Sequence, residues 1–277
     1  MSFPLRDAVA VVTGAASGIG RATALELANR GTHLALMDRD AAGLAATAEA
    51  ARHSGVRVTT RTLDVTDTAA VAGLPAEVVR DHGKATVLVN NAGVALMGRL
   101  EELSLDEFRW LVEINFLAVV GMTKAFLPEL LRQPAAHIVN LSSLYGIIAP
   151  AEQTAYASAK FAVRGFSESL RHELEGTGVG VTVVHPGGFR TNISTGSRIA
   201  AAIDGPESRA RREAWSAAFL TRPPEMAAAA IVRAIERRQP RLIIGADART
   251  AAFIQWLLPV RYWAVLKAAY ARFLTPR

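Results

Sequence analysis

The segment Thr13-Gly14-Ala15-Ala16-Ser17-Gly18-Ile19-Gly20 decides the fold. It follows an apolar, β-branched run and leads directly into a helical pattern. A glycine-rich turn between a strand and a helix lets the backbone approach a pyrophosphate, which the unpaired N–H groups and positive dipole end of the helix then bind. We expect Gly14 to make the turn, Gly18 to permit the close approach and Gly20 to pack the helix tightly. Two further cofactor contacts in this loop are expected from Ser17 and Ile19.

The same alternation of short apolar runs and longer helical patterns continues along the chain. The runs that predict strands are Ala8–Thr13, His33–Met37, Val56–Leu63, Thr86–Asn90, His137–Ser142, Val179–His185 and Leu242–Gly245. The patterns that predict helices are Ile19–Arg30, Ala41–Ser54, Thr68–His82, Leu105–Leu131 and Thr154–Glu175. This order predicts an α/β fold with a doubly wound parallel sheet of the Rossmann type and helices on both faces. We expect one domain over 1–248, with residues 249–277 as a helical extension of it.

Composition excludes several classes of protein. The chain has 277 residues, 51% hydrophobic and 20% charged, and no cysteine, so disulfides and cysteine metal sites are excluded. The formal net charge of +6 lies in the C-terminal third, without a known nucleic-acid motif, and we expect no nucleic-acid partner. The six histidines show no metal-ligand spacing, so no metal site is predicted. No leader-like segment stands at the N-terminus, and a cytoplasmic protein is expected.

Asp38 ends the second expected strand, 18 residues past Gly20. A carboxylate there can accept hydrogen bonds from the adenosine ribose of NAD and would repel the 2′-phosphate of NADP. Arg39 follows, and its guanidinium could pair with that phosphate, stack on adenine or remain a loop charge. We favour NAD(H) as the cofactor and keep NADP(H) as the alternative.

Polar residues also follow the third and fourth expected strands. Asp64-Val65 follows one and Asn90-Asn91-Ala92-Gly93 the other, and ligands bind at the carboxyl ends of strands in open α/β sheets. Taken alone, Asp64 could instead cap the next helix, and the asparagine pair could form a turn.

Tyr156 and Lys160 lie four apart at the start of an expected helix and so share one face, and Ser143 ends the fifth expected strand. A neighbouring cation lowers a tyrosine pKa toward the working range, so Tyr156 could exchange a proton with an alcohol or carbonyl while Ser143 holds the substrate oxygen. By spacing alone, a tyrosine and a lysine would be an ordinary surface pair.

Taken together, these motifs make the chain, from about Leu5 to Gly245, resemble the short-chain dehydrogenase/reductase family of NAD(P)-dependent oxidoreductases. The residues that carry the resemblance, in the family's order and spacing, are Thr13-Gly14-x-x-x-Gly18-x-Gly20, Asn90-Asn91-Ala92-Gly93, Asn115, Ser143, Tyr156-x-x-x-Lys160 and Pro186-Gly187. The departure Tyr156-Ala157-Ser158-Ala159-Lys160, where many members have alanine then serine before the lysine, keeps the spacing of both side chains.

The resemblance implies a role for each matching residue. It implies that Tyr156 is the catalytic acid/base, that Lys160 lowers the Tyr156 pKa and binds the nicotinamide ribose, and that Ser143 orients the substrate oxygen. It also implies that Asn115 holds a water in the proton relay to Lys160. The cofactor contacts that it implies further along the chain are Asp64, Val65, Asn91, Ala92, Gly93, Pro186, Gly187 and Thr191.

The implied activity is hydride transfer between a nicotinamide cofactor and an alcohol or carbonyl. The segment Gly188–Pro224 falls where the family places its variable substrate loop, and its apolar residues favour a lipophilic substrate such as a sterol, a retinoid or an aliphatic alcohol. Arginines in the same segment leave an anionic substrate group open. The alternatives are an NADPH-dependent carbonyl reductase, or a scaffold or peripheral membrane protein on an idle fold, against which the intact set of four catalytic residues argues.

The chain continues for 32 residues past Gly245, and Thr250–Leu258 and Val260–Phe273 are expected to be helices separated by Pro259. On a helical wheel Tyr262, Trp263, Leu266, Tyr270, Phe273 and Leu274 gather on one face, with Arg261 and Arg272 opposite. This tail could wall the substrate pocket, lie in a membrane interface or bind another protein. The resemblance also implies a homo-oligomer, a homodimer or homotetramer, through Leu105–Leu131 and Thr154–Glu175. Because the tail could block further association around the seventh strand, we favour the dimer.

Overall fold

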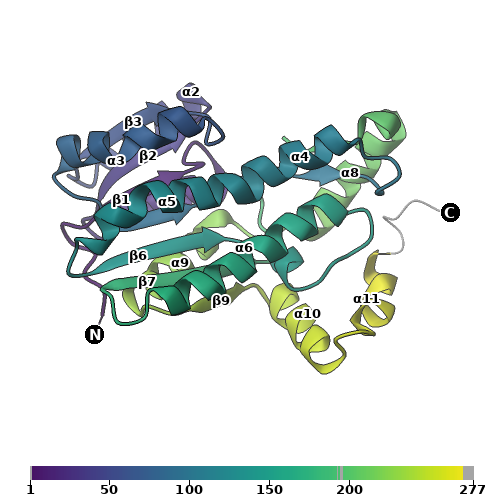
Figure 1. Cartoon of the computed structure of the whole chain (residues 1–277). Coiled ribbons are helices and arrows are strands. Elements are labelled where there is room, and N and C mark those ends of the chain that lie inside the picture. Colours follow the sequence, from purple (N-terminus) through teal and green to yellow (C-terminus); the bar gives the residue numbers. More distant parts are fainter. Residues whose placement is uncertain (1, 192, 194–195, 271–277) are drawn as a thin grey trace.

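A computed structural model describes residues 2–191, 193 and 196–270, without the side chains of residues 269 and 270. Its main element is a seven-stranded sheet in which every neighbouring pair is parallel, in the order β3-β2-β1-β4-β6-β7-β9. The strands are β1 (Val9–Thr13), β2 (His33–Asp38), β3 (Val58–Thr62), β4 (Val87–Asn90), β6 (Ala136–Leu141), β7 (Val179–Pro186) and β9 (Arg241–Ile244). The chain leaves β1 toward one edge and returns at β4 toward the other, which confirms the predicted doubly wound sheet (Figure 1).

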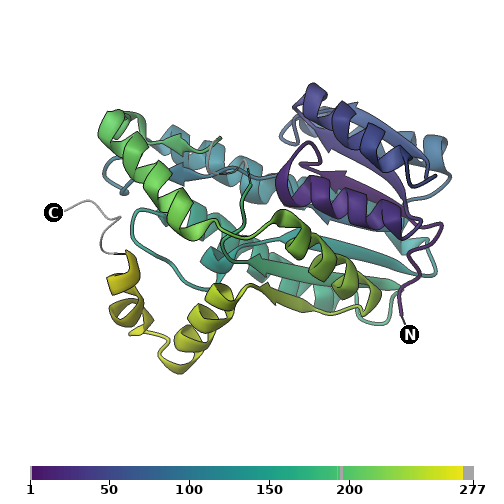
Figure 2. The same ribbon diagram turned by 180° about the vertical axis from the view of Figure 1, so that it is seen from behind.

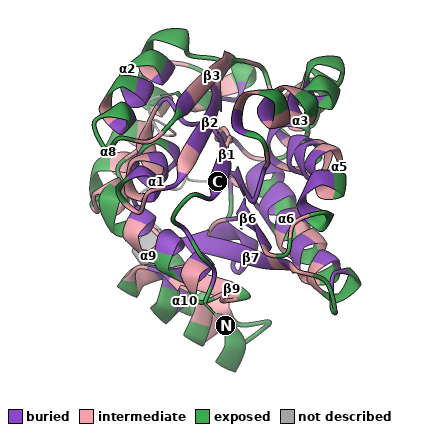
Figure 3. Ribbon diagram, turned by 90° about the vertical axis from the view of Figure 1, so that its left-hand side faces the viewer, coloured by how far each residue is buried: buried purple, intermediate pink, exposed green. Residues whose placement is uncertain are grey.

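Helices cover both faces of this sheet (Figures 1 and 2). The helices on one face are α1 (Gly18–Asn29), α2 (Ala41–Arg52) and α9 (Pro224–Glu236). Those on the other face are α3 (Thr68–His82), α5 (Ala118–Leu131) and α6 (Thr154–Glu173). A further helix, α4 (Leu105–Val112), leads into α5. The buried surfaces all turn toward the strands, while the outer surfaces of the helices are exposed (Figure 3).

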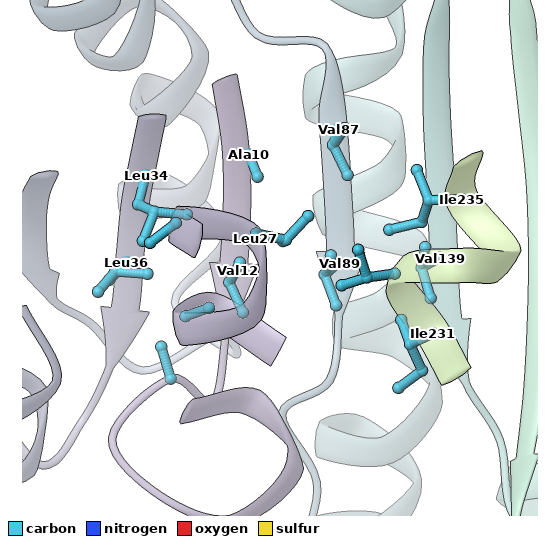
Figure 4. Packing of buried hydrophobic residues seen from close by; sticks show 14 of the residues in the cluster. Ala10, Val12, Leu27, Leu34, Leu36, Val87, Val89, Val139, Ile231 and Ile235 are labelled. Carbon is cyan, nitrogen blue, oxygen red and sulfur yellow. The ribbon is translucent and has the colours of Figure 1, made fainter. Parts of the chain in front are cut away.

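Alternate residues of each central strand feed two separate hydrophobic clusters. Ala10 and Val12 of β1 point toward α1 and α9, where they meet Leu27 and Ile231 (Figure 4). Val9 and Val11 point to the opposite face, into a cluster that also contains Phe126 of α5 and Leu170 of α6. Because both faces are covered, the central strands read as continuous apolar runs rather than alternating ones.

The expected helix over Leu105–Leu131 is continuous but contains a π-helical segment, Glu113–Leu117, between α4 and α5. Its length and apolar composition are those of a membrane-crossing helix as well. However, Met122, Phe126 and Leu130 of α5 are buried in the sheet-facing cluster, as in the core helix of a globular domain.

Several elements were not expected from the sequence. Two short strands, β5 (Leu96–Met97) and β8 (Arg198–Ile199), form a separate parallel pair above the carboxyl ends of the main sheet. The segment expected as a substrate loop contains a 3₁₀ turn, Ala201–Ile203, and the helix α8 (Pro206–Phe219), and α9 follows it.

The tail forms two helices, α10 (Ala246–Leu257) and α11 (Tyr262–Tyr270), which project together from the end of the molecule beyond β9 (Figures 1 and 2). The break between them includes Pro259, as expected, but α10 begins four residues before the predicted Thr250. The predicted positions Arg272, Phe273 and Leu274 lie outside the described residues, as does the side chain of Tyr270.

Candidate active site

A cavity of about 390 Å³ opens at the carboxyl ends of the central strands. It is lined by most of the residues that the sequence singles out: Gly14, Ser17, Gly18, Ile19, Asp38, Arg39, Asp64, Val65, Asn91, Ala92, Gly93, Ser143, Tyr156, Lys160, Pro186, Gly187 and Thr191. Gly20 and Asn115 are not part of the lining and act from behind it. The structure therefore brings residues from β1, β2, β4, β6, α6 and β7 to one place.

The glycine-rich turn is built for close backbone approach. Gly14 and Gly18 have φ of 67° and 54°, in the left-handed region that favours glycine. A Cβ on Gly20 would lie 2.1 Å from the carbonyl oxygen of Gly14, so the first turn of α1 packs directly on the loop. A Cβ on Gly18 would lie 3.0 Å from Thr191. These contacts place the turn at Gly14 and the tight packing of α1 at Gly20, and they leave a cradle at the start of α1 that suits a pyrophosphate.

Thr13 and Asn91 join this loop to the end of β4. The backbone N–H groups of Asn91 and Ala92 both donate to Thr13 Oγ1, at 3.0 and 3.1 Å. The Asn91 amide donates in turn to the carbonyls of Thr13 and Gly14, at 3.0 and 3.1 Å. The loop is thus held rigidly before any ligand arrives, which lowers the ordering cost of binding.

Asp38 lies at the end of β2 and faces the same loop. Its Oδ2 accepts a hydrogen bond from the N–H of Ala16 at 2.9 Å, and its Oδ1 accepts one from the N–H of Asp40 at 3.0 Å. Both bonds fix the carboxylate at the cavity wall, where its remaining lone pairs can accept hydroxyl donors. Arg39 also lines the cavity and is exposed.

Asp64 does not cap the next helix, the role left open by its position after the third strand. Asp67 does so, accepting from the N–H of Ala70 at 3.0 Å. Asp64 accepts from the backbone N–H of Thr66 at 3.0 Å and from its hydroxyl at 2.7 Å. These bonds, and then the charge of Arg39, hold the pKa of Asp64 below its usual value, so its carboxylate stays ionised beside the cavity.

Asn115 is fully buried within the π-helical segment. Its Oδ1 accepts from the N–H of Val94, and its Nδ2 donates to the carbonyl of Val94, both at 2.8 Å. A Cβ on Gly93 would lie 3.1 Å from Asn115 Oδ1 and 3.5 Å from Lys160 Nζ, so Gly93 leaves room for both side chains at this point. Asn115 is the polar residue that interrupts this apolar helix, and it lies in the widened π-helical turn. Such turns are frequent at functional sites.

Ser143, Tyr156 and Lys160 meet on the floor of the cavity. The side chains of Ser143 and Tyr156 are hydrogen-bonded to each other. Lys160 Nζ lies 5.6 Å from the centre of the Tyr156 ring and donates to the carbonyl of Leu141 at 3.0 Å. A phenol, a hydroxyl and an ammonium group at these positions can exchange a proton with an oxygen bound between the first two.

The Tyr156 pKa differs from the sequence-based expectation. Burial raises it to about 12, and the hydrogen bond from Ser143 offsets this only in part. Burial also lowers the pKa of Lys160 to about 8. In the protein alone, burial therefore outweighs any lowering of the tyrosine pKa by the lysine, because both groups lose solvent and neither charged form is favoured.

Pro186 ends β7, and Gly187, which follows it, lies against a residue that sequence reasoning missed. Asp247, in the first turn of α10, accepts from the N–H of Gly188 at 2.8 Å and pairs with Arg222 at 2.8 Å. A Cβ on Gly187 would lie 2.4 Å from the Asp247 carboxylate. Nothing near Asp247 in the sequence indicates this contact, since it depends on α10 folding back on β7.

The outer part of the cavity is largely apolar. Its lining residues there include Leu96, Met97, Leu144, Tyr145, Phe189, Ile193, Trp215, Phe219 and Leu220. Of the apolar residues expected to form the substrate lid, Ile199 and Ile203 lie elsewhere. Glu152 has a φ of 65° and is buried at the same end, where it pairs with Arg211 at 3.4 Å and Arg99 at 3.8 Å. This residue, with a buried carboxylate and a backbone in the left-handed region, was also missed from the sequence.

Comparison with known proteins identifies the family. Residues 8–201 match the family described as short chain dehydrogenase. The chain belongs to that family. SadH of Mycobacterium tuberculosis, whose name describes it as an oxidoreductase, is 39% identical to it over 267 residues, covering 96% of each protein.

Solved structures of short-chain dehydrogenases resemble the whole fold. A member from Burkholderia phymatum in complex with NAD is 30% identical, with a TM-score of 0.84 over 92% of this chain and 95% of that one. An alcohol dehydrogenase from the archaeon Thermococcus sibiricus, complexed with 5-hydroxy-NADP, is 28% identical, with a TM-score of 0.72 over 86% and 95% of the two chains. The protein is therefore an oxidoreductase of this family that uses a nicotinamide cofactor.

Proposed function

We propose that this short-chain dehydrogenase interconverts a lipophilic alcohol and its carbonyl compound, with NAD(H) as the preferred cofactor. The observation that carries the proposal is the cluster of Ser143, Tyr156 and Lys160, which lies between the cofactor cradle and the apolar end of one cavity. The family supplies hydride chemistry, and the cluster supplies a proton at the oxygen of the substrate.

Tyr156 is proposed as the acid/base. Since burial raises the pKa of its phenol to about 12, the protein alone holds this proton at neutral pH and can donate it to a carbonyl oxygen. Ser143 positions that oxygen through the hydrogen bond that it shares with Tyr156. When bound, the nicotinamide supplies or accepts the hydride at the carbon atom.

Lys160 and Asn115 are proposed to support the proton transfer. Lys160 has a pKa of about 8, lies behind the Tyr156 ring and can release or accept a proton near neutral pH. Asn115 fixes the backbone of Val94, next to Gly93, whose Cα faces both Asn115 and the lysine.

The test is Tyr156→Phe, which removes the phenol oxygen and keeps the ring. We expect turnover of ketone substrates to fall about 10²–10⁴-fold, the range for loss of a general acid. NADH affinity, measured by fluorescence titration, should change by less than about threefold, because the cradle lies at α1. A variant that keeps most of its kcat would disprove the acid/base assignment.

Asp38 is proposed to select NAD(H). Its carboxylate is fixed at the cavity wall by Ala16 and Asp40, where it would meet ribose hydroxyls and repel a 2′-phosphate. We expect NADH to bind at least about tenfold tighter than NADPH, which corresponds to about 1.4 kcal/mol. Asp38→Asn should narrow the ratio of the two affinities. In the matched control, Arg39→Gln, only the affinity for NADPH should fall.

The second candidate function is an NADPH-dependent carbonyl reductase. Arg39 favours it, because an exposed guanidinium lines the cavity one residue beyond Asp38. Tighter binding of NADPH in the same titration would select this function and make Arg39 the determining residue. Binding of neither cofactor would instead support a scaffold on an idle fold.

The apolar outer cavity supports a lipophilic substrate, a sterol, a retinoid or an aliphatic alcohol.

We also propose a cytoplasmic homodimer and a single domain over 1–248, with 249–277 as its extension. Exposed Leu117, Leu131 and Phe161 on the long helices support self-association there. Of the positions open to the tail, contact with its own chain is supported by Tyr262, Trp263 and Leu266, which pack against the hydrophobic cluster that includes Tyr156.

A further inference from the structure

The two tail helices have one apolar face turned inward and another turned outward. The inward face of α10 consists of small residues, with Ala248 and Ala251 buried against the cluster that includes Tyr156. Its outward face carries large ones: Phe253 is 60% exposed, Trp256 73% and Leu257 59%, and Val260, just beyond the helix, is 90% exposed. Large apolar side chains normally turn inward, so this reversed order requires an explanation.

The four exposed residues form a single surface, here called the outer apolar face. Their spacing of three, four and seven residues from Phe253 places those of α10 on one side of the helix and continues into the turn after it. The rings of Phe253 and Trp256 lie 5.9 Å apart, which confirms that they are neighbours. Contiguous exposed apolar surface of this kind marks an interaction site.

The surface also carries one sign of charge. Arg249, one turn before Phe253, is exposed, as are Arg261 and Lys267 beyond it. After Asp247 the sequence has no Asp or Glu. Asp247 itself is engaged by Arg222 and the backbone of Gly188, at the cavity. The outer apolar face is thus flanked by cations, and the acidic residue of α10, Asp247, is already engaged at the cavity.

This charge distribution selects among the partners that an apolar face could bind. A second copy docked face to face would bring the same three cations together, which is unfavourable for an apolar contact. A bilayer with anionic headgroups satisfies both features, since Trp and Phe insert at the headgroup boundary and Arg and Lys meet the phosphates. We propose that the outer apolar face docks the protein on an anionic membrane surface.

The face differs from the one that the sequence singled out. Tyr262, Trp263 and Leu266 of α11 pack on the protein itself, and the phenol oxygen of Tyr262 accepts a hydrogen bond from the N–H of Ala149 at 2.9 Å. They anchor the tail to the body, so the inserted residues are those of α10 and the following turn. The inference does not depend on the proposed reaction.

The test is co-sedimentation of the full-length protein with vesicles of phosphatidylcholine alone and with an equal share of phosphatidylglycerol. We expect binding to the mixed vesicles and at least about tenfold weaker binding to the neutral ones, with release at about 0.5 M KCl. Trp256→Ser should weaken binding to the mixed vesicles by about tenfold or more, since an aromatic residue dominates interfacial insertion. Met226→Ser is the matched control, because Met226 is also exposed but lies on α9, and it should bind as the wild type does.

Val260→Asp tests the same face independently, should Trp256→Ser fail to fold, and NADH binding serves as the check on folding for each variant. Equal sedimentation of the wild type with and without vesicles would overturn the proposal. So would unchanged vesicle binding by both variants. A wild-type dimer that becomes monomeric in either variant, with no vesicle binding at any stage, would assign the face to a second copy and likewise overturn it.

Discussion

Lys160 is a buried cation whose cost to folding can be measured. The residue is almost fully buried, and burial lowers its pKa from 10.5 to about 8. The unfolded chain therefore binds the proton more tightly than the folded one does. Replacing Lys160 with Met, which is similar in length and uncharged, should stabilise the protein while abolishing its chemistry, as is common where function and stability conflict.

The size of the effect follows from the pKa difference. A shift from 10.5 to about 8 corresponds to about 3 kcal/mol at pH 7, at about 1.4 kcal/mol for each pKa unit. The variant also leaves the carbonyl of Leu141 without the lysine that donates to it, which costs about 1 kcal/mol. The expected net gain in the free energy of unfolding is thus about 2 kcal/mol at pH 7.

The sign of the pH dependence is equally specific. Because the folded pKa is depressed, the penalty is complete below pH 8 and fades as the pH rises from about 8 to 10.5. Urea unfolding of wild type and Lys160→Met, measured in parallel at pH 7, 8.5 and 9.5 without cofactor, isolates this residue, because other titrations cancel in the difference. The stability advantage of the variant should shrink steadily across that series. A variant that is less stable at pH 7, or a difference that does not change with pH, would refute this account of the buried lysine.

Three further outcomes follow from the contacts around the cavity. Gly20→Ala should abolish NADH binding in a fluorescence titration, because its Cβ would lie 2.1 Å from the carbonyl oxygen of Gly14, and retained affinity would show that the loop can relax. Asp247→Ala should raise the KM for the cofactor several-fold with little change in kcat, since the carboxylate positions Gly188, and an unchanged KM would make Asp247 merely structural. Tyr262→Phe removes the acceptor for the N–H of Ala149 and should lower the free energy of unfolding by about 1 kcal/mol, measured by urea unfolding, whereas no change would mean that water replaces the phenol.

The central sheet could be predicted from the sequence because its strands are buried on both faces. Continuous apolar runs marked the strands, and glycines marked the ends of the helices. In the structure three of these glycines, Gly31, Gly83 and Gly176, have φ near 80°, as expected of a glycine that ends a helix. The edge strand β3 was predicted less well and begins two residues later than expected, since its partly exposed residues weaken the apolar signal. The helix α9 was missed, although Pro224 in its first turn and the spacing of Ile231 and Ile235 were available as signals.

The candidate site was predictable where its residues form local motifs and not where tertiary contacts create it. The glycine-rich turn and the spacing of Tyr156 and Lys160 are local, whereas Asp247 reaches the cavity only because α10 folds back on β7. Glu152 is close to Tyr156 in sequence, but its pairing with Arg211 depends on a distant segment. The net Tyr156 pKa of the protein alone was not predictable for the same reason, because the sequence shows the neighbouring charge but not the loss of water that raises this pKa. The helix α8 has no buried residue, and so carries no apolar pattern from which to predict it.

The hydrogen bond between Tyr262 and Ala149 ties α11 to the rim of the cavity. Ala149 lies seven residues before Tyr156 and next to Pro150, which lines the cavity. Strain applied to α11, whether from a fused tag, a cleavage or a partner, therefore reaches the rim of the cavity while leaving the nucleotide cradle at α1 untouched. Kinetic constants measured on a C-terminally altered protein would then differ in the KM for substrate rather than for cofactor.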